Sequence, residues 1–175
     1  MHKPLSITVF VVSLLISMQI HAQDSDSLSS QNEYKFGIGA GAGFATGYGL
    51  SFRYIPEKFG GQVNFAPYKD KETERYSFGV TFLYMLIESN STNLFLYQAN
   101  HYYYNSEISY LYNPGMPNNQ EETRYTEGYF NNGLGFGIEI IFVKRVGLNI
   151  MAGYAFYDNF QQLNVTGELA LYYKF

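Results

Sequence analysis

From Tyr34 to Phe175, apolar residues alternate with small or polar ones in a series of short segments. An alternation of period two is typical of a β-strand with one apolar face, whereas an amphipathic helix repeats every 3.6 residues. Eight segments follow this pattern, over residues 36–42, 48–54, 62–67, 76–86, 94–104, 133–142, 148–156 and 165–175. The pattern therefore predicts an all-β fold built from eight strands.

The segment 94–104 is the one whose two faces are hard to tell apart, because both carry apolar residues. Gln98 and Asn100 mark one of its faces as polar. We therefore predict that its apolar face consists of Phe95, Tyr97, Ala99 and Tyr103.

The connections between these segments alternate in length. Residues 56–58, 89–92 and 143–145 form short connections after the second, fourth and sixth strands, and the longer ones are 43–47, 69–74, 105–131 and 158–162. Bacterial outer-membrane barrels have short periplasmic turns and longer extracellular loops. The order of connections is the one expected for a chain with both ends in the periplasm.

The composition of the two faces distinguishes a membrane barrel from a soluble one. A soluble eight-stranded barrel of the lipocalin kind has its apolar face inside and a charged face outside. Here the less apolar face consists mostly of Gly, Ser, Thr, Asn, Gln and Ala, and its mid-strand charges are Arg53, Glu139 and Glu168. That face fits a narrow lumen better than a soluble surface. We therefore predict an eight-stranded antiparallel up-and-down transmembrane β-barrel over residues 34–175.

The first residues resemble an export signal. Lys3 precedes an apolar run from Ile7 to Ile20, and His21-Ala22 follows it. A membrane helix needs about 20 apolar residues, and this run is shorter, so we interpret residues 1–22 as a cleaved signal peptide. Residues 23–33 are polar except for Leu28 and are predicted to be a flexible lead-in.

Charge and cysteine content exclude several functions. The formal net charge is −4, removal of Lys3 with the leader lowers it by one, and no basic stripe is present, which argues against nucleic-acid binding. Cysteine is absent, so disulfides and thiolate metal sites are excluded. No cofactor or metal is expected, and scattered acids such as Glu72, Glu74, Glu121 and Glu122 are interpreted as solvated loop charges.

The three mid-strand charges suggest how the lumen is filled. An eight-stranded barrel encloses a space that side chains fill, so a diffusive pore is not expected. Arg53 and Glu139 each fall about three residues from the periplasmic end of their strands and both point inward. We predict a structural ion cluster of Arg53 and Glu139, with Glu168 as the candidate third member.

The leader, the eight alternating segments, the aromatic residues at the strand ends and the final residues Leu171-Tyr172-Tyr173-Lys174-Phe175 resemble the small outer-membrane β-barrel proteins of Gram-negative bacteria, of the OmpX and OmpA type. The resemblance covers residues 34–175 and implies location in the cell outer membrane, among its lipids. It also implies that the outer-membrane assembly machinery reads Leu171, Tyr173 and Phe175. The same residues are expected to face lipid.

Some barrels of this fold are enzymes, including lipid A acyl transferases, lipid A deacylases and proteases. After loss of the leader, His101 is the single histidine available for such chemistry. In the deacylases the nucleophile follows in a His-x-Ser motif, but here Tyr103 occupies that position, and Ser106 is predicted on the opposite strand face. We interpret His101 as a histidine of the aromatic belt. We therefore expect that the chain is not an enzyme. The alternatives are a lipid-modifying enzyme and a narrow solute pore.

The long third outer connection is the most plausible working surface. Its two flanks, 108–112 and 124–129, still alternate, so the fifth and sixth strands are predicted to continue above the membrane and to turn near 113–119. Such a hairpin binds an extracellular partner by adding a strand or by aromatic contact. The candidate partner surface consists of Tyr110, Tyr112, Tyr125 and Tyr129. A structural or adhesion-like role is therefore expected.

Overall fold

The computed structural model describes residues 34–112, 120–142 and 144–175, without the side chains of residues 111, 112, 120 and 121. The predicted signal peptide, the lead-in and the predicted turn at 113–119 lie outside the described residues. The strands are β1 (Phe36–Gly43), β2 (Gly49–Tyr54), β3 (Phe59–Lys69), β4 (Thr73–Ile87), β5 (Thr92–Tyr112), β6 (Gln120–Phe142), β7 (Val146–Tyr157) and β8 (Gln162–Lys174). Within the described ranges, no helix is long and apolar enough to cross a membrane.

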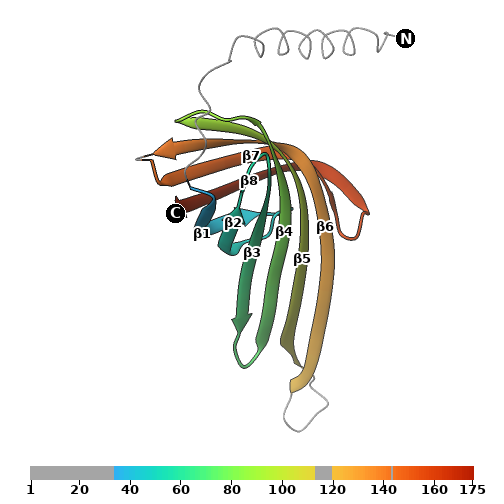
Figure 1. Ribbon diagram of the computed structural model, residues 1–175. Coiled ribbons are helices and arrows are strands. Elements are labelled where there is room, and N and C mark those ends of the chain that lie inside the picture. The colour runs from blue at the N-terminus through green and yellow to red at the C-terminus, as the bar shows by residue number, and fades with distance from the viewer. Residues whose placement is uncertain (1–33, 113–119, 143) are drawn as a thin grey trace, which may run out of the picture. The chain divides into compact units, whose positions relative to one another are not determined.

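The eight strands close into a barrel (Figure 1). Each strand pairs antiparallel with its neighbour in sequence, and β1 also pairs with β8. At the seam, the Phe175 N–H donates to the Phe36 carbonyl at 2.9 Å, and the Phe36 N–H donates to the Phe175 carbonyl at 3.2 Å. The predicted eight-stranded antiparallel up-and-down barrel is confirmed.

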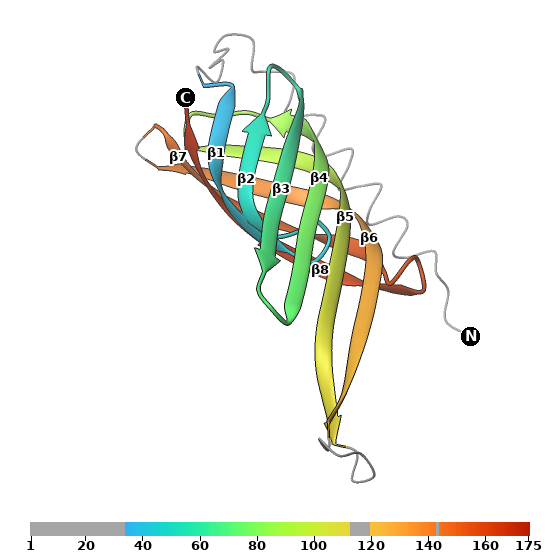
Figure 2. The ribbon, with the colours of Figure 1, turned by 90° about the horizontal axis from the view of Figure 1, so that it is seen from below.

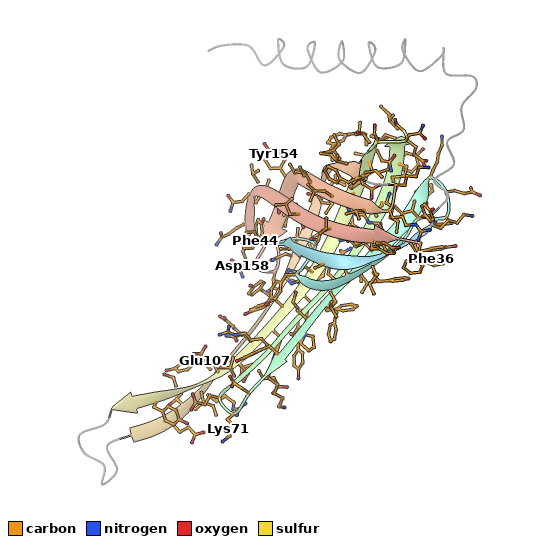
Figure 3. The ribbon with its side chains drawn as sticks, turned by 90° about the vertical axis from the view of Figure 1, so that its left-hand side faces the viewer. Phe36, Phe44, Lys71, Glu107, Tyr154 and Asp158 are labelled. Atoms are coloured by element: carbon orange, nitrogen blue, oxygen red, sulfur yellow. The ribbon has the colours of Figure 1, made fainter. Side chains whose placement is uncertain are left out.

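The connections define the two ends of the barrel. Residues 55–58, residues 88–91 and the β6–β7 connection with Lys144 and Arg145 join strands at one end, here called the short-turn end. Residues 44–48, 70–72 and 158–161 join strands at the other, the long-loop end. Figure 3 shows Phe36 and Phe44 at opposite ends of β1, with Phe44 on the same side as Asp158 of the β7–β8 connection.

The outer face of the barrel is apolar and the inner face is mixed. Leu134, Tyr154 and Leu171 are exposed on the outside, and Tyr154 projects away from the wall in Figure 3. Aromatic rings gather at the short-turn end, where the Phe36 ring stacks on Tyr54 at 4.6 Å. An apolar outer band with aromatic residues at its rim is the surface of a transmembrane barrel.

The predicted faces of the fifth strand are wrong. Phe95, Tyr97 and Ala99 are buried in the lumen, and Gln98 and Asn100 lie on the outer face. Gly137 of β6 faces Phe95 and has no side chain, so large β5 side chains are needed to fill the lumen at this position. A Cβ at Gly137 would overlap the Phe95 ring. Space filling therefore decides the orientation of this strand, and polarity does not.

The outward amides of β5 bond to one another and to β6. Asn132 Nδ2 donates to Asn100 Oδ1 at 2.8 Å, and Gln98 Nε2 donates to the same oxygen at 3.1 Å. Asn100 Nδ2 in turn donates to Gln98 Oε1 at 3.1 Å. Mutual hydrogen bonding lowers the cost of placing amides on an otherwise apolar face.

The strands differ greatly in length. β1 and β2 have 8 and 6 residues, while β5 and β6 have 21 and 23. β5 and β6 extend beyond the other strands as a paired ribbon, as Figures 1 and 2 show. The predicted continuation of these two strands is confirmed for 105–112 and 120–131, where Tyr112 still pairs with Gln120. The barrel therefore has a low wall at β1–β2 and a high one at β5–β6.

Candidate functional site

The lumen at the short-turn end contains a buried ion cluster centred on Glu139 of β6. Its carboxylate is fully buried and lies between two cations: Lys174 Nζ donates to Oε2 at 2.7 Å, and Arg53 Nη1 is 3.5 Å from Oε1. Among the described residues, Arg53 Nη1 and Glu139 Oε1 have no hydrogen-bond partner, so this second contact is an ion pair without hydrogen-bond geometry. The shorter Lys174 contact is therefore the stronger of the two.

Neutral and aromatic groups complete the cluster. Asn93 Nδ2 donates to Glu139 Oε2 at 2.7 Å, and Arg53 Nη2 donates to Gln62 Oε1 at 2.8 Å. The Arg53 guanidinium also lies 4.4 Å from the centre of the Tyr172 ring. The lumen at this end is filled by side chains that touch one another.

The predicted cluster is brought together only in part. Arg53 and Glu139 meet, but Glu168 lies elsewhere, and Lys174 takes the place of a third member. Sequence reasoning missed Lys174, although the alternation of β8 puts it on the same face as Glu168 and Tyr172. Lys174 is the last residue of its strand, so it is not among the mid-strand charges.

Glu168 instead holds the first connection, residues 44–48, which we call the inward loop. Glu168 Oε2 accepts hydrogen bonds from the Thr46 hydroxyl and from the Thr46 N–H, the latter at 2.9 Å. Ala45 and Thr46 are buried, so this loop folds into the barrel. Gly47 has a φ of 78°, a conformation that favours glycine and lets the chain turn back toward β2.

Side chains from four more strands bind the backbone of the inward loop. Its Phe44 carbonyl accepts from His101 Nδ1 at 2.8 Å and from Asn131 Nδ2 at 3.0 Å. Asn64 Nδ2 donates to the carbonyls of Thr46 and Gly47. The Tyr48 N–H donates to Ser77 Oγ at 3.2 Å. Together with Glu168, residues of β3, β4, β5, β6 and β8 hold this loop.

His101 is a lumen residue, so its interpretation as a belt histidine is wrong. Its side chain is buried and its Nε2 lies 3.0 Å from Ser77 Oγ. With the Nδ1 proton directed at the Phe44 carbonyl, Nε2 accepts the hydroxyl proton of Ser77. Ser106, as predicted, lies on the other face of β5, where it contacts Thr126. The reversed orientation of β5 explains why His101 points inward.

A cavity of about 420 Å³ lies beside the inward loop at the long-loop end. Four aromatic rings contribute to its walls, and His101 and Asn131 line it as well. Its lining also includes three small residues, Ala42, Gly43 and Gly167. This volume is in the range of small-molecule sites. Among the described residues, no cluster of His, Asp and Glu could hold a metal ion.

The four predicted partner tyrosines do not form one surface. The register pairs Tyr110 with Glu122 and Tyr125 with Glu107, which places these two exposed tyrosines on opposite faces of the β5–β6 ribbon. The Tyr129 ring packs at a tilt against Tyr103, with 4.8 Å between the ring centres, and lines the cavity at the barrel mouth. The side chain of Tyr112 lies outside the described residues.

The predicted assembly residues lie on the outer face at the end of β8 and just after it. Leu171, Tyr173 and Phe175 are all exposed there. The Arg145 side chain donates to the Tyr173 hydroxyl at 3.0 Å, and the Phe175 ring stacks on Phe36 at 6.0 Å. These contacts connect the last strand to the β6–β7 turn and to β1.

No protein-family model matches the sequence, and no curated protein matches it. Among solved structures, the chain is similar to the N-terminal β-barrel domain of Pseudomonas aeruginosa OprF, with 13% identity over 80% of this chain and 95% of that chain and a TM-score of 0.45. It is also similar to Neisserial surface protein A (NspA), with 15% identity over 80% of this chain and 93% of that chain and a TM-score of 0.45.

Proposed function

We propose that this chain is a non-enzymatic protein of the cell outer membrane that binds an extracellular partner through its β5–β6 hairpin. The apolar outer face supports a place in the membrane, because closure of the barrel pairs the strand backbones that hydrocarbon cannot solvate. The packed ion cluster and the inward loop argue against a solute pore. By resemblance, Leu171, Tyr173 and Phe175 are the residues that the assembly machinery reads.

The observation that carries the proposal is the open edge of β6. This strand pairs with β7 only from Asn132 onward, so residues 120–131 have β5 as their single strand partner in the described part of the chain. The Phe130 N–H donates to Asn159 Oδ1, and its carbonyl accepts from the Asn159 N–H. Backbone groups alternate in direction along a strand, so those of Arg124, Thr126 and Gly128 point to the open side.

An open strand edge is a template for another strand. It binds an extended peptide through main-chain hydrogen bonds, and neighbouring side chains add selectivity. Tyr125 is 56% exposed and Tyr110 is 50% exposed, so one ring is available on each face of the ribbon. The proposed partner is therefore an extended polypeptide segment outside the cell.

The test removes one edge N–H and leaves the β5–β6 ladder intact. Thr126→Pro deletes a donor on the open side, and proline is tolerated at strand edges. Thr126→Val is the matched control, because it removes the hydroxyl that contacts Ser106 and keeps the N–H. Cells that display each variant are compared in two assays. The first measures how many cells are retained on arrays of ten-residue peptides, and the second measures how fast cells sediment when they adhere to one another.

We expect binding to be lost in Thr126→Pro and in a deletion of residues 109–123, and to be kept in Thr126→Val. Boiled and unboiled gel mobility shows that each variant still forms a closed barrel. Unchanged binding after the deletion would exclude the hairpin as the working surface. Channel conductance across a planar bilayer would favour the solute pore instead.

One observation favours a second candidate, a hydrolase. Ser77 and His101 have the geometry of a nucleophile and its base, with Oγ and Nε2 3.0 Å apart. Ser77 is fully buried, however, and it accepts the Tyr48 N–H beneath the inward loop. We therefore assign the pair to holding the loop. Ester or lipid A hydrolysis that disappears in both Ser77→Ala and His101→Ala would replace this assignment.

A further inference from the structure

The barrel wall has a notch above its two shortest strands. β1 pairs with β8 only up to Gly43–Glu168, so residues 162–167 of β8 have β7 as their single strand partner among the described strands. On the other side, β2 pairs with β3 only up to Leu50–Phe65, and β3 continues to Lys69 against β4. The chain between β1 and β2 is the inward loop, which leaves the wall and enters the lumen. The notch therefore lies between β8 and β3.

The lips of the notch are apolar and unusually exposed. Leu50 of β2 is 74% exposed and Val165 of β8 is 70% exposed, and both border the notch. Below it, Ala42 stands opposite Leu169, which belongs to the apolar outer band. The unpaired edge of β8 needs hydrogen-bonding groups from outside, because open edges do not occur in pure hydrocarbon. The notch thus fits the outer membrane interface, where chains and headgroups meet.

The lining of the cavity beside the inward loop reaches this notch. Ala42 and Gly167 are exposed on the outer face of the wall, yet they line the same cavity as His101 and Asn131, which lie in the lumen. At Gly167, an added Cβ would find no heavy atom within 4 Å. Small residues at the threshold keep the passage clear.

The polar groups at the floor of the cavity already have partners. His101 bonds to the Phe44 carbonyl and contacts Ser77, while Asn131 donates to the same carbonyl and accepts the Asp158 N–H. The remaining walls are rings: Tyr103 packs 4.8 Å from Tyr129 and 6.3 Å from Tyr48. A floor with satisfied polar groups and aromatic walls favours an apolar ligand.

We propose that the notch and the cavity form a lateral binding site for the acyl chain of a lipid from the outer leaflet. The chain enters between β8 and β3 and lies against the rings of Phe44, Tyr103 and Tyr129. The lipid headgroup stays at the interface and bonds to the unpaired backbone of β8. This site rests on the membrane location of the proposed function and is independent of the hairpin.

The test is photo-crosslinking of the folded chain in phosphatidylethanolamine and phosphatidylglycerol vesicles. A small fraction of the phosphatidylethanolamine carries a diazirine at the end of one acyl chain. Mass spectrometry then locates the adducts on lumen residues Tyr103 and Tyr129 and on the outward residue Leu134. We expect adducts on both sets in the unaltered chain.

Two glycine variants decide whether the notch is the route. Gly167→Phe fills the open space at the threshold, and we expect loss of the lumen adducts with the Leu134 adduct kept. Gly61→Phe is the matched control, since Gly61 also faces outward on the wall, with its nearest contact at 3.9 Å, and it should keep both sets. Boiled and unboiled gel mobility confirms closure of each variant.

Absence of lumen adducts in the unaltered chain, or their persistence in Gly167→Phe, would overturn the proposal. Lumen adducts that form only with an added diazirine fatty acid, and never with the vesicle lipid, would also overturn it. The hairpin deletion of residues 109–123 should leave lumen labelling unchanged. That result separates failure of this site from failure of the hairpin proposal.

Discussion

The two ends of the lumen are filled in different ways. At the short-turn end, side chains from strands meet one another, with Glu139 between Arg53 and Lys174. At the long-loop end, the backbone of the inward loop occupies the lumen, and Glu168 is one of five side chains that bind it. Both ends contain a buried carboxylate, but one neutralises cations and the other binds an N–H and a hydroxyl. A buried glutamate thus has a different role at each end of the lumen.

The difference shows what each filling requires. A side-chain filling needs complementary charges in register, because an unpaired buried charge is very costly. A backbone filling needs a partner for every buried N–H and carbonyl. Asn64, Ser77, His101 and Asn131 supply those partners together with Glu168. The lumen polarity at the long-loop end therefore reflects the needs of one loop.

The largest effect is expected from Glu139→Ala, which removes the anion between two buried cations. We expect the free energy of unfolding to fall by roughly 3–5 kcal/mol, the usual cost of breaking a buried ion pair. Arg53→Ala should cost less, because Lys174 still binds Glu139 at 2.7 Å. Urea unfolding in detergent micelles measures both variants. Equal losses in the two would show that Lys174 does not stabilise the carboxylate.

The next largest effect is expected from Glu168→Ala, which acts at the other end of the lumen. It leaves the Thr46 N–H and hydroxyl without their acceptor, at about 1–3 kcal/mol for a buried unsatisfied group. Hydrogen exchange should show faster exchange of the amides of residues 44–48, while those of β6 near Glu139 stay protected. Glu168→Gln keeps one acceptor oxygen, so its exchange rates at residues 44–48 should lie between those of the unaltered chain and those of Glu168→Ala. Uniform loss of protection along the barrel would contradict a local role.

An effect of similar size is expected where the inward loop approaches the wall most closely. A Cβ at Gly79 of β4 would overlap the Thr46 carbonyl, so Gly79→Ala must push the loop outward. Such overpacking typically costs about 1–3 kcal/mol. Gly61→Ala on the outer face of β3 is the control, with its nearest contact at 3.9 Å. If both variants unfold at the same urea concentration, the loop does not pack against Gly79 in the membrane.

The sequence predicts the strands well because each residue of a strand faces one of two sides, and a period of two is visible locally. It also predicts that Arg53 and Glu139 face the lumen, since both lie on the less apolar face of their strands. It misassigns β5, because Gln98 and Asn100 suggest a lumen face that space filling reserves for Phe95 and Tyr97.

The inward loop is not visible in the sequence at all. Its position depends on partners that come from five strands far apart in the chain, such as Asn64 and Glu168. The cavity and the notch follow from that loop and from strand lengths, which the alternation fixes only loosely. The pattern that would have helped is the large number of amide, hydroxyl and imidazole groups on lumen faces near the long-loop end.

The smallest effect is expected at an exposed counterpart of Glu168. Asp70, in the β3–β4 connection, accepts hydrogen bonds from the Tyr68 hydroxyl at 2.7 Å and from the N–H groups of Glu72 and Thr73. The Tyr68 hydrogen bond, followed by those from the two backbone groups, lowers the pKa of Asp70 below its ordinary value. Glu168 and Asp70 thus make the same kind of contact, one buried and one in water.

Because the folded pKa of Asp70 is lowered, its contribution to stability is present above the unfolded pKa and is lost as pH falls through the folded pKa. We therefore expect the Thr73 amide to exchange faster with solvent in acid, after correction for intrinsic rates, with barrel stability almost unchanged. An NMR titration in micelles follows this loss, and Asp70→Asn should remove its pH dependence. A loss of barrel stability comparable to that of Glu168→Ala would mean that burial does not set the difference between the two carboxylates.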